Sequence, residues 1–237
     1  MGLSSSRSTQ KRLDNEVDQI NKNNYSIDYF HNSKIIGELP PLPIPGSWQK
    51  FHRANLIKCS LEQTVGSGYV CEFGVLTGRT LNQIAGFFKN EDVFGFDSFE
   101  GLPEPWHMTD DRVFPKGQMS LGGNLPDVLP NVKLVVGWYD KTLPSWIDKN
   151  SNVVKFIHID CDLCSSTETV LTLLNNQIVP GTIIHFDDFY CWGNPEEFTK
   201  WQDGEYLALQ HWIEKFDRTF EILHRNNYFQ CAIRIIK

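Results

Sequence analysis

The sequence lacks the positive charge and the long apolar runs that several classes of protein require. Its 237 residues carry 22 Lys and Arg against 29 Asp and Glu, which gives a formal net charge of -7. Proteins that grip a phosphate backbone depend on clustered Lys and Arg, so nucleic acid is not an expected partner. No apolar run approaches the length that spans a bilayer, and the N-terminus lacks the apolar stretch of a secretory signal. We therefore expect a soluble, cytoplasmic protein with no transmembrane segment.

Cysteine is also too scattered to define a motif. The chain has 6 Cys, several of them inside apolar runs, where a free Cys usually behaves as a small core residue. Cys161 and Cys164 are spaced like a redox or zinc pair, but no second pair stands at zinc spacing, so we interpret them as a coincidence. The opening fits the loose pattern for N-myristoylation at Gly2, which leaves membrane association through an acyl chain as the weaker alternative to a plain polar tail.

The chain divides into a polar tail and one folded domain. Residues 1–30 have few large apolar side chains and cannot repay the entropy of ordering, so they are predicted to be disordered. A Pro-rich lead-in at 38–46 ends where a helix can begin, at about Ser47. With 41% apolar residues, the remainder can bury one sizeable core. Residues 31–237 are therefore expected to form a single domain.

Short β-type runs alternate with helical runs from residue 68 onward. This alternation is typical of parallel strands joined by crossover helices. The final segments, 220–224 and 228–236, are separated by a turn and predict an antiparallel hairpin at the sheet edge. The sequence thus predicts the α/β class, with a doubly wound, mostly parallel seven-stranded sheet. The other predicted strands are 69–73, 93–97, 132–139, 153–160 and 182–188, and the predicted helices are 79–89 and 166–176.

The loop after the first strand has the character of a nucleotide-binding loop. Gly74 and Gly78 allow a tight turn and a close approach to a ligand. The third glycine of a dinucleotide fingerprint is missing, and Glu72 would repel a pyrophosphate but could pair with the ammonium of an amino-acid ligand. S-adenosylmethionine carries such an ammonium. Glu72, Gly74, Val75, Thr77 and Gly78 are therefore candidate cofactor-binding residues.

Two further positions fit the same ligand. Asp97 ends the second strand 19 residues after Gly78, the usual distance at which a carboxylate accepts hydrogen bonds from ribose hydroxyls, and Ser98 follows it. Trp138, just past the third strand, could pack against an adenine or could be a core residue, and both interpretations stay open. Glu72 as a satisfied strand-end carboxylate and Asp97 as a helix cap are the alternatives to ligand binding.

Acidic side chains crowd the ends of the fourth and fifth strands. Asp160 and Asp162 follow one strand, and Asp187 and Asp188 follow the other. Such a cluster is costly unless a cation neutralises it, and hard oxygen ligands favour Mg²⁺, with Mn²⁺ or Ca²⁺ as alternatives. Capping or surface carboxylates are the interpretation without a metal. His158 and His185 lie within the strands and are interpreted as packed residues or as supports of the ligands.

Several motifs are shared with one known family: Glu72-Phe73-Gly74-Val75, Gly95 to Pro103, Gly137-Trp138-Tyr139, Thr142-Leu143-Pro144, Asp160-Cys161-Asp162-Leu163, Ser166-Thr167, Pro180-Gly181 and Asp187-Asp188. On these motifs the chain resembles the macrocin O-methyltransferase family of class I, Rossmann-like methyltransferases over roughly residues 65–237. The resemblance implies S-adenosylmethionine as cofactor, a metal held by Asp160, Asp187 and Asp188, and acceptor hydroxyls that are often on sugar units of natural products. The surroundings of Cys71 and of the Cys161 loop depart from the commonest family versions, which affects the acceptor more than the chemistry.

Methyl transfer to a hydroxyl needs an aligned oxygen that has lost its proton. Asp160 is the candidate metal ligand and catalytic base, and His107 is a second candidate base. Segments 98–130 and 189–205 are too long for simple connections and are predicted to form a lid over a hydroxylated small molecule. Their aromatic and apolar side chains suit a sugar face. They include Trp106, Met108, Tyr190, Trp192 and Trp201.

Two other functions use the same kind of sheet. A nicotinamide oxidoreductase should show the three-glycine loop and a hydride-transfer pair such as Tyr and Lys, which are not found. A non-catalytic protein that binds the cofactor is the second alternative, because a fold does not prove activity. The presence of all three implied metal ligands favours an enzyme. A homo-oligomer is compatible with the sequence but not indicated by it.

Overall fold

The computed structural model describes residues 49–190, 196–225 and 229–237, and within them a seven-stranded sheet organises the chain. The strand order is β5-β2-β1-β6-β7-β9-β8. Five strands are parallel, and β9 pairs antiparallel with both β7 and β8, which confirms the predicted doubly wound sheet with a C-terminal hairpin. The strands are β1 (Tyr69–Phe73), β2 (Val93–Asp97), β5 (Val132–Val136), β6 (Val154–Ile159), β7 (Ile178–Phe186), β8 (Phe220–Arg225) and β9 (Cys231–Ile235).

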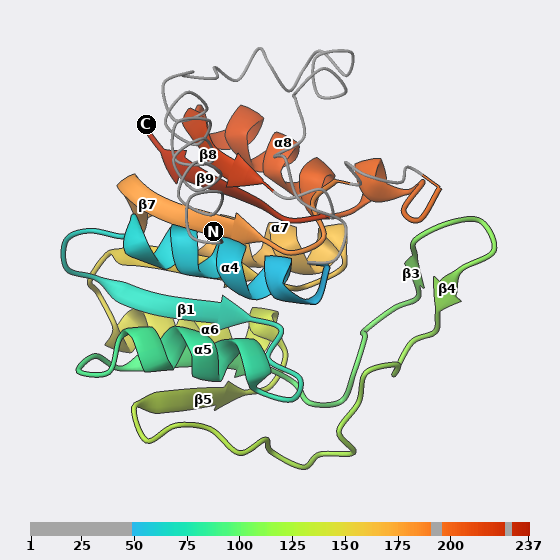
Figure 1. Cartoon of the computed structure of the whole chain (residues 1–237), viewed down its shortest axis with the longest axis horizontal. Helices are drawn as coiled ribbons and strands as arrows, with labels where there is room; N and C mark the ends of the chain where they lie inside the picture. Colours follow the sequence, from blue (N-terminus) through green and yellow to red (C-terminus); the bar gives the residue numbers. More distant parts are fainter. Residues whose placement is uncertain (1–48, 191–195, 226–228) are drawn as a thin grey trace, which may run out of the picture.

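Helices cover both faces of this sheet. The helices α4 (Gln49–Glu62) and α5 (Arg79–Phe87) lie on one face, in front of the sheet and on either side of β1 in Figure 1. The helices α6 (Tyr139–Lys149), α7 (Cys164–Leu173) and α8 (Glu205–Phe216) lie on the other. Each layer has its own apolar cluster, because each helix must bury one face against the sheet. Leu81 and Ile84 belong to the first cluster, and Trp146, Leu171 and Trp212 belong to the second.

The centre of the sheet fixes where a ligand can bind. β6 is buried along its whole length, as expected for a parallel strand covered on both faces. β1 pairs with β2 on one side and with β6 on the other, so the strand order reverses between β1 and β6. Ligands of open α/β sheets bind beyond the carboxyl ends of the strands at this reversal. The two-stranded hairpin of β3 (Trp106–His107) and β4 (Val113–Phe114) extends from the same end (Figure 1).

Two helices differ from the sequence-based assignment. The predicted strand 132–139 ends at Val136, and α6 begins at Tyr139 because the Trp138 carbonyl accepts the amides of Lys141 and Thr142, both at 3.0 Å. Pro144 lies inside α6. Proline has no N–H to donate within a helix, so its presence in the sequence does not favour a helix at this position. The helix α8 was not predicted, although its buried residues follow a helical period. They are Glu205, Tyr206, Ala208, Leu209, Trp212 and Ile213.

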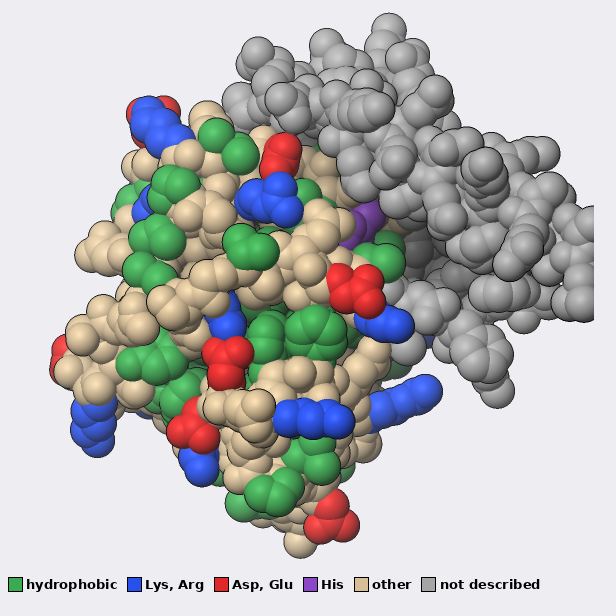
Figure 2. All heavy atoms as spheres, turned by 60° about the vertical axis from the view of Figure 1, so that its left-hand side comes forward, with side chains coloured by type: hydrophobic (Ala, Val, Ile, Leu, Met, Phe, Trp, Pro, Cys, Tyr) green, Lys and Arg blue, Asp and Glu red, His purple; other side chains and the backbone are tan. Residues whose placement is uncertain are grey.

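Several predictions concern residues outside the described ones. These are the tail 1–30 with Gly2, the lead-in 38–46, the helix start at Ser47, Trp192 and part of the turn after β8. Among the residues that the structure describes, no helix is long and apolar enough to cross a membrane. Figure 2 shows that acidic and basic side chains are interspersed among hydrophobic ones on the described part of the face in view.

Gly74 should be one of the least replaceable residues of the fold. Its φ is 91°, and an added Cβ would lie 1.8 Å from the carbonyl oxygen of Asp160. We expect Gly74→Ala to lower the free energy of unfolding by about 2 kcal/mol or more, measured by urea denaturation. The control is Gly86→Ala in α5, where an added Cβ meets only Leu129 at 3.9 Å and helix propensity favours alanine. An equal loss in both variants would contradict the close approach.

Candidate active site

A cavity of about 660 Å³ opens at the carboxyl ends of the parallel strands. Residues that follow all five parallel strands contribute to its wall, which is the arrangement expected of a ligand site in an open α/β sheet. The cavity-lining residues that end these strands or follow them are Gly74, Leu76, Asp97, Ser98, Gly137, Trp138, Tyr139, Asp160, Cys161, Asp162, Asp187 and Asp188.

Backbone hydrogen bonds hold these strand-end residues in register. The amide of Gly74 donates to Phe96, and the amide of Asp160 donates to Phe73, at 3.0 and 2.9 Å. The amides of Gly137 and Asp187 donate to the neighbouring strands in the same way, both at 2.9 Å. The sheet ladder therefore continues one residue beyond the strands, so the site residues are attached to rigid elements rather than to free loops.

Asp97 organises the loop that follows β1. One oxygen, Oδ2, accepts the backbone amides of Val75 and Leu76, both at 2.8 Å, and Oδ1 accepts the amide of Phe99 at 2.7 Å. These bonds stabilise Leu76 at a φ of 46°, a conformation that a leucine rarely adopts. A carboxylate has about four lone-pair directions, so three amides leave room for one more donor, such as a ribose hydroxyl. Asp97 can therefore shape the loop and contact a ligand.

The predicted cofactor residues are not all at the cavity. Gly74, Asp97, Ser98 and Trp138 line it, and Trp138 belongs to none of the hydrophobic clusters of the described residues. The other four do not line the cavity. Thr77 is exposed, and Val75 and Gly78 are buried. Glu72 is buried as well and is a hydrogen-bond partner of His158.

The three predicted metal ligands are divided between two groups that share Asp160. Ligand atoms of Asp160, Asp187 and His158 lie within 4.8 Å of one another, and those of Asp160, Asp162 and Asp188 do so as well. Asp160 is common to both groups and is the most exposed of the four aspartates. Crowded carboxylates of this kind match the oxygen ligands that a hard divalent cation requires. The donor set of the described residues therefore fits the metal that the sequence suggested.

Glu205 belongs to this site and was missed by sequence reasoning. Its side chain is fully buried at the first residue of α8. Its Oε1 accepts the amide of Cys161 at 3.1 Å, and its Oε2 accepts the amide of Asp188 at 3.2 Å, so one carboxylate joins the loops after β6 and β7. Burial, followed by the charges of Asp188 and Asp160, raises the pKa of Glu205 well above its ordinary value. The local sequence carries no signal for this role, because Glu205 begins a helix 17 residues after Asp188.

The imidazole of His158 carries a positive charge next to the buried carboxylates of Glu72 and Asp187. Its Nδ1 donates to Glu72 at 2.8 Å, and its Nε2 lies 3.6 Å from Oδ1 of Asp187. Burial alone would lower the pKa of His158, but the interactions with Asp187 and Glu72 raise the pKa to about 10. A protonated imidazole therefore offsets part of the negative charge. The contact with His158 also gives Glu72 a structural partner.

An apolar wall closes the opposite side of the cavity. Trp106 stacks on Phe114 with ring centroids 5.1 Å apart, and it meets the edge of Phe198 at 5.9 Å. Trp106 and Met108 are buried rather than exposed, but both line the cavity. This hairpin comes from the predicted lid segment 98–130, and Phe198 comes from the predicted segment 189–205. The two predicted lid segments are therefore packed against each other.

The remaining aromatic and basic candidates lie away from the lining. His107 is exposed and is not among the residues that line the cavity. Tyr190 and Trp201 contact each other, with ring centroids 4.2 Å apart, and neither lines the cavity. Of the two candidate bases, only Asp160 therefore faces the space where an acceptor could bind.

Comparison with known proteins agrees with this geometry. Residues 124–219 match the family model described as macrocin-O-methyltransferase (TylF). The crystal structure of CalS11, a calicheamicin methyltransferase, is similar with a TM-score of 0.60 at 20% identity, over 99% of this chain and 94% of that one. The O-methyltransferase NovP is similar with a TM-score of 0.55 at 20% identity, over 78% of this chain and 80% of that one. A search of curated proteins gave no match.

The fold is therefore that of the class I methyltransferases. The segment 124–219, which carries β6, β7 and the aspartates that follow them, is similar to the macrocin O-methyltransferase family.

The crowded charges predict how stability depends on pH when divalent ions are removed by a chelator. The pKa of Asp162 and of Glu205 is raised by burial and neighbouring carboxylates, and that of His158 is raised to about 10. The folded protein then binds more protons than the unfolded chain, so the free energy of unfolding should fall as pH rises from about 5 to 9. Urea denaturation at a series of pH values in chelator measures this.

Asp162→Asn should flatten this dependence. Asp162 has a φ of 60°, which asparagine tolerates well, so the variant removes a charge without straining the backbone. The matched control is Asp203→Asn, a nearby exposed aspartate outside the cavity lining. A stability that rises with pH over this range, or the same slope in both variants, would contradict the electrostatic account.

Proposed function

We propose that this chain is a divalent-cation-dependent O-methyltransferase that uses S-adenosylmethionine to methylate a hydroxyl of a small molecule, with a sugar unit or natural product as acceptor. The observation that carries the proposal is a single cavity whose wall includes both the glycine loop with Asp97 and the cluster of Asp160, Asp187 and Asp188. The first group suits a nucleoside and the second suits a cation, so donor and acceptor would meet between them.

The cofactor would lie over the ends of β1, β2 and β5. Gly74 permits a close backbone approach, Asp97 can accept a ribose hydroxyl, and Ser98 lies beside it. Trp138 offers an aromatic face at the same wall for an adenine. Glu72, Val75, Thr77 and Gly78, which the sequence also suggested, would then act by shaping this loop from behind the lining.

The acceptor would lie over the ends of β6 and β7. Transfer of a methyl group from a sulfonium requires the attacking oxygen to lie in line with the S–CH₃ bond and to lose its proton. Asp160, Asp187 and Asp188 are the residues that would hold Mg²⁺, or Mn²⁺ or Ca²⁺ in its place. The cation, when bound, supplies the Lewis acidity that lowers the pKa of the acceptor hydroxyl. Asp160, the most exposed of these carboxylates, is positioned to take the proton.

The apolar wall would orient the rest of the acceptor. Leu102, Trp106, Met108 and Phe114 present a surface that suits the apolar face of a sugar ring and excludes water from the reacting oxygen. The similar structure CalS11 is described as a TDP-rhamnose 3'-O-methyltransferase, and its fold matches this chain with a TM-score of 0.54 at 18% identity. A sugar hydroxyl is accordingly the first acceptor class to screen.

Calorimetric titration with S-adenosylhomocysteine, with and without Mg²⁺, tests the cofactor without knowledge of the acceptor. Binding that is followed by turnover in an acceptor screen supports the enzyme. Binding without turnover on any hydroxylated acceptor favours the non-catalytic alternative. Absence of binding in a folded sample overturns the proposal and brings nicotinamide cofactors forward.

Asp188→Asn should separate the metal role from the cofactor role. Asp188 lies in the carboxylate cluster, so the variant should lose Mg²⁺-dependent turnover by about 100-fold while it keeps its affinity for S-adenosylhomocysteine. Steady-state kinetics and calorimetry measure the two effects. Asp92→Asn, an exposed aspartate just before β2, is the control. Unchanged Mg²⁺-dependent turnover in Asp188→Asn would remove the metal role.

Asp97→Ala should have the opposite effect. The variant loses a ribose acceptor and also the bonds to Val75, Leu76 and Phe99, so the affinity for S-adenosylhomocysteine should fall by at least about 10-fold. Calorimetry at a temperature where circular dichroism shows the variant folded provides the measurement. Asp127→Ala, at an exposed aspartate away from the cavity, is the matched control. Normal cofactor affinity in Asp97→Ala would refute its assignment.

A further inference from the structure

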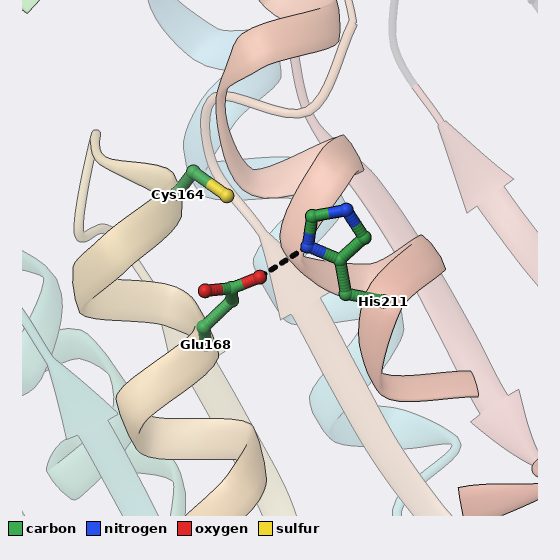
Figure 3. A group of neighbouring side chains, drawn as sticks. All are labelled: Cys164, Glu168 and His211. Atoms are coloured by element: carbon green, nitrogen blue, oxygen red, sulfur yellow. Dashed lines mark hydrogen bonds and ion pairs between the residues drawn. The ribbon is translucent and has the colours of Figure 1, made fainter. Parts of the chain in front are cut away.

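Outside the cavity, three side chains with different metal-binding atoms converge between two helices. Cys164 and Glu168 lie one turn apart on α7, and His211 faces them from α8 (Figure 3). One ligand atom from each of the three lies within 4.8 Å of the other two. His211 Nδ1 also forms a hydrogen bond with Glu168 Oε1. The functional site makes no use of this group, since none of the three side chains lines the cavity.

We propose that Cys164, Glu168 and His211 form a binding site for a borderline-soft divalent cation, with Zn²⁺ as the preferred ion. A thiolate, an imidazole and a carboxylate are the three ligand types that zinc accepts in proteins. Tetrahedral bonds of about 2.0 to 2.3 Å place neighbouring ligand atoms roughly 3.3 to 3.8 Å apart, so these side chains need only small adjustments. The proposal is independent of the methyltransferase function.

The backbone already supplies the required spacing. Residues four apart on a helix share one face, which places Cys164 and Glu168 side by side without any loop. The packing of α7 against α8 adds the third ligand from a residue 43 positions from Glu168. A site built on two packed helices is held more firmly than one on loops, so little order must be gained when the ion binds.

An ion could reach this site from solvent. The side chain of His211 is 53% exposed and that of Glu168 is 39% exposed, while Cys164 is half-buried beneath them. The open side leaves a fourth position for water, which completes a tetrahedral shell. This arrangement differs from the aspartate cluster, whose oxygen ligands are hard and largely buried, so the two sites should select different metals.

The surroundings of Cys164 also favour a cation. Burial, followed by the nearby carboxylates of Glu168, Asp203 and Glu104, raises the pKa of the Cys164 thiol to about 12. The same negative charges attract a divalent ion. Binding would displace the thiol proton to solvent, and the bonds to the ion would take the place of the hydrogen bond between His211 Nδ1 and Glu168 Oε1.

An ion here would join the two helices that border the active site. Cys164 begins α7, directly after the loop that carries Asp160 and Asp162, and α8 begins at Glu205, which bonds to Cys161 and Asp188. Binding to the folded state alone raises stability by mass action. Zn²⁺ should therefore raise the melting temperature of the full-length chain, and it should do so without any cofactor.

The test uses the full-length, reduced and tag-free protein after treatment with a chelator. All measurements are made in a protein that carries Asp188→Asn, so that the aspartate cluster contributes less to the measured metal binding. Zn²⁺ affinity is measured by competition with a chromophoric chelator, and Co²⁺ is added separately to look for thiolate-to-cobalt charge-transfer absorption. We expect one Zn²⁺ per chain and a cobalt spectrum of tetrahedral, thiolate-containing type. Cys164→Ser should abolish the charge-transfer band, and His211→Gln should weaken Zn²⁺ binding at least about 10-fold.

Cys59→Ser is the matched control, because Cys59 is an exposed free cysteine on α4, on the other face of the sheet. It should keep both the band and the affinity. Circular dichroism of the metal-free variants establishes that each is folded. The proposal is overturned if no thiolate band forms, or if Cys164→Ser and His211→Gln bind Zn²⁺ as tightly as the parent.

Discussion

The last backbone hydrogen bonds of the parallel sheet are the interaction on which the site depends. The amides of Gly74, Asp160 and Asp187 donate to the neighbouring strands just beyond the final strand residues, so the side chains that face the cavity start from fixed positions. That rigidity allows carboxylates to be held close together despite their repulsion. The repulsion is then offset locally, by the amides that donate to Glu205 and by the positive charge of His158.

The cavity joins two surfaces of opposite chemical character. One wall consists of polar strand ends, whose positions are fixed by the sheet. The other consists of apolar side chains from the β3–β4 hairpin and its neighbours, which pack in one cluster with Phe198. Fixed polar groups suit the parts of a reaction that are common to a family, while an apolar wall built from connecting segments can vary with the acceptor.

The sheet and the position of Asp160, Asp187 and Asp188 at the cavity could be predicted because parallel strands end at one edge and the acidic residues follow them directly. Glu205 could not, since it reaches the site from α8, which begins 17 residues after Asp188. His107 looked suitable in sequence, but adjacent residues of a strand point to opposite sides, so burial of Trp106 turns His107 to solvent. The buried contact of Glu72 with His158 spans two strands and leaves no local signal.

The close approach of Gly74 to the Asp160 carbonyl gives the proposed site a property of its own. An added Cβ would lie only 1.8 Å from that oxygen, so the loop after β1 and the loop after β6 are in contact with no side chain between them. A displacement of one loop would therefore displace the other loop as well. If the two ligands bind as proposed, their affinities are thermodynamically linked, and each must change the affinity of the other by the same factor.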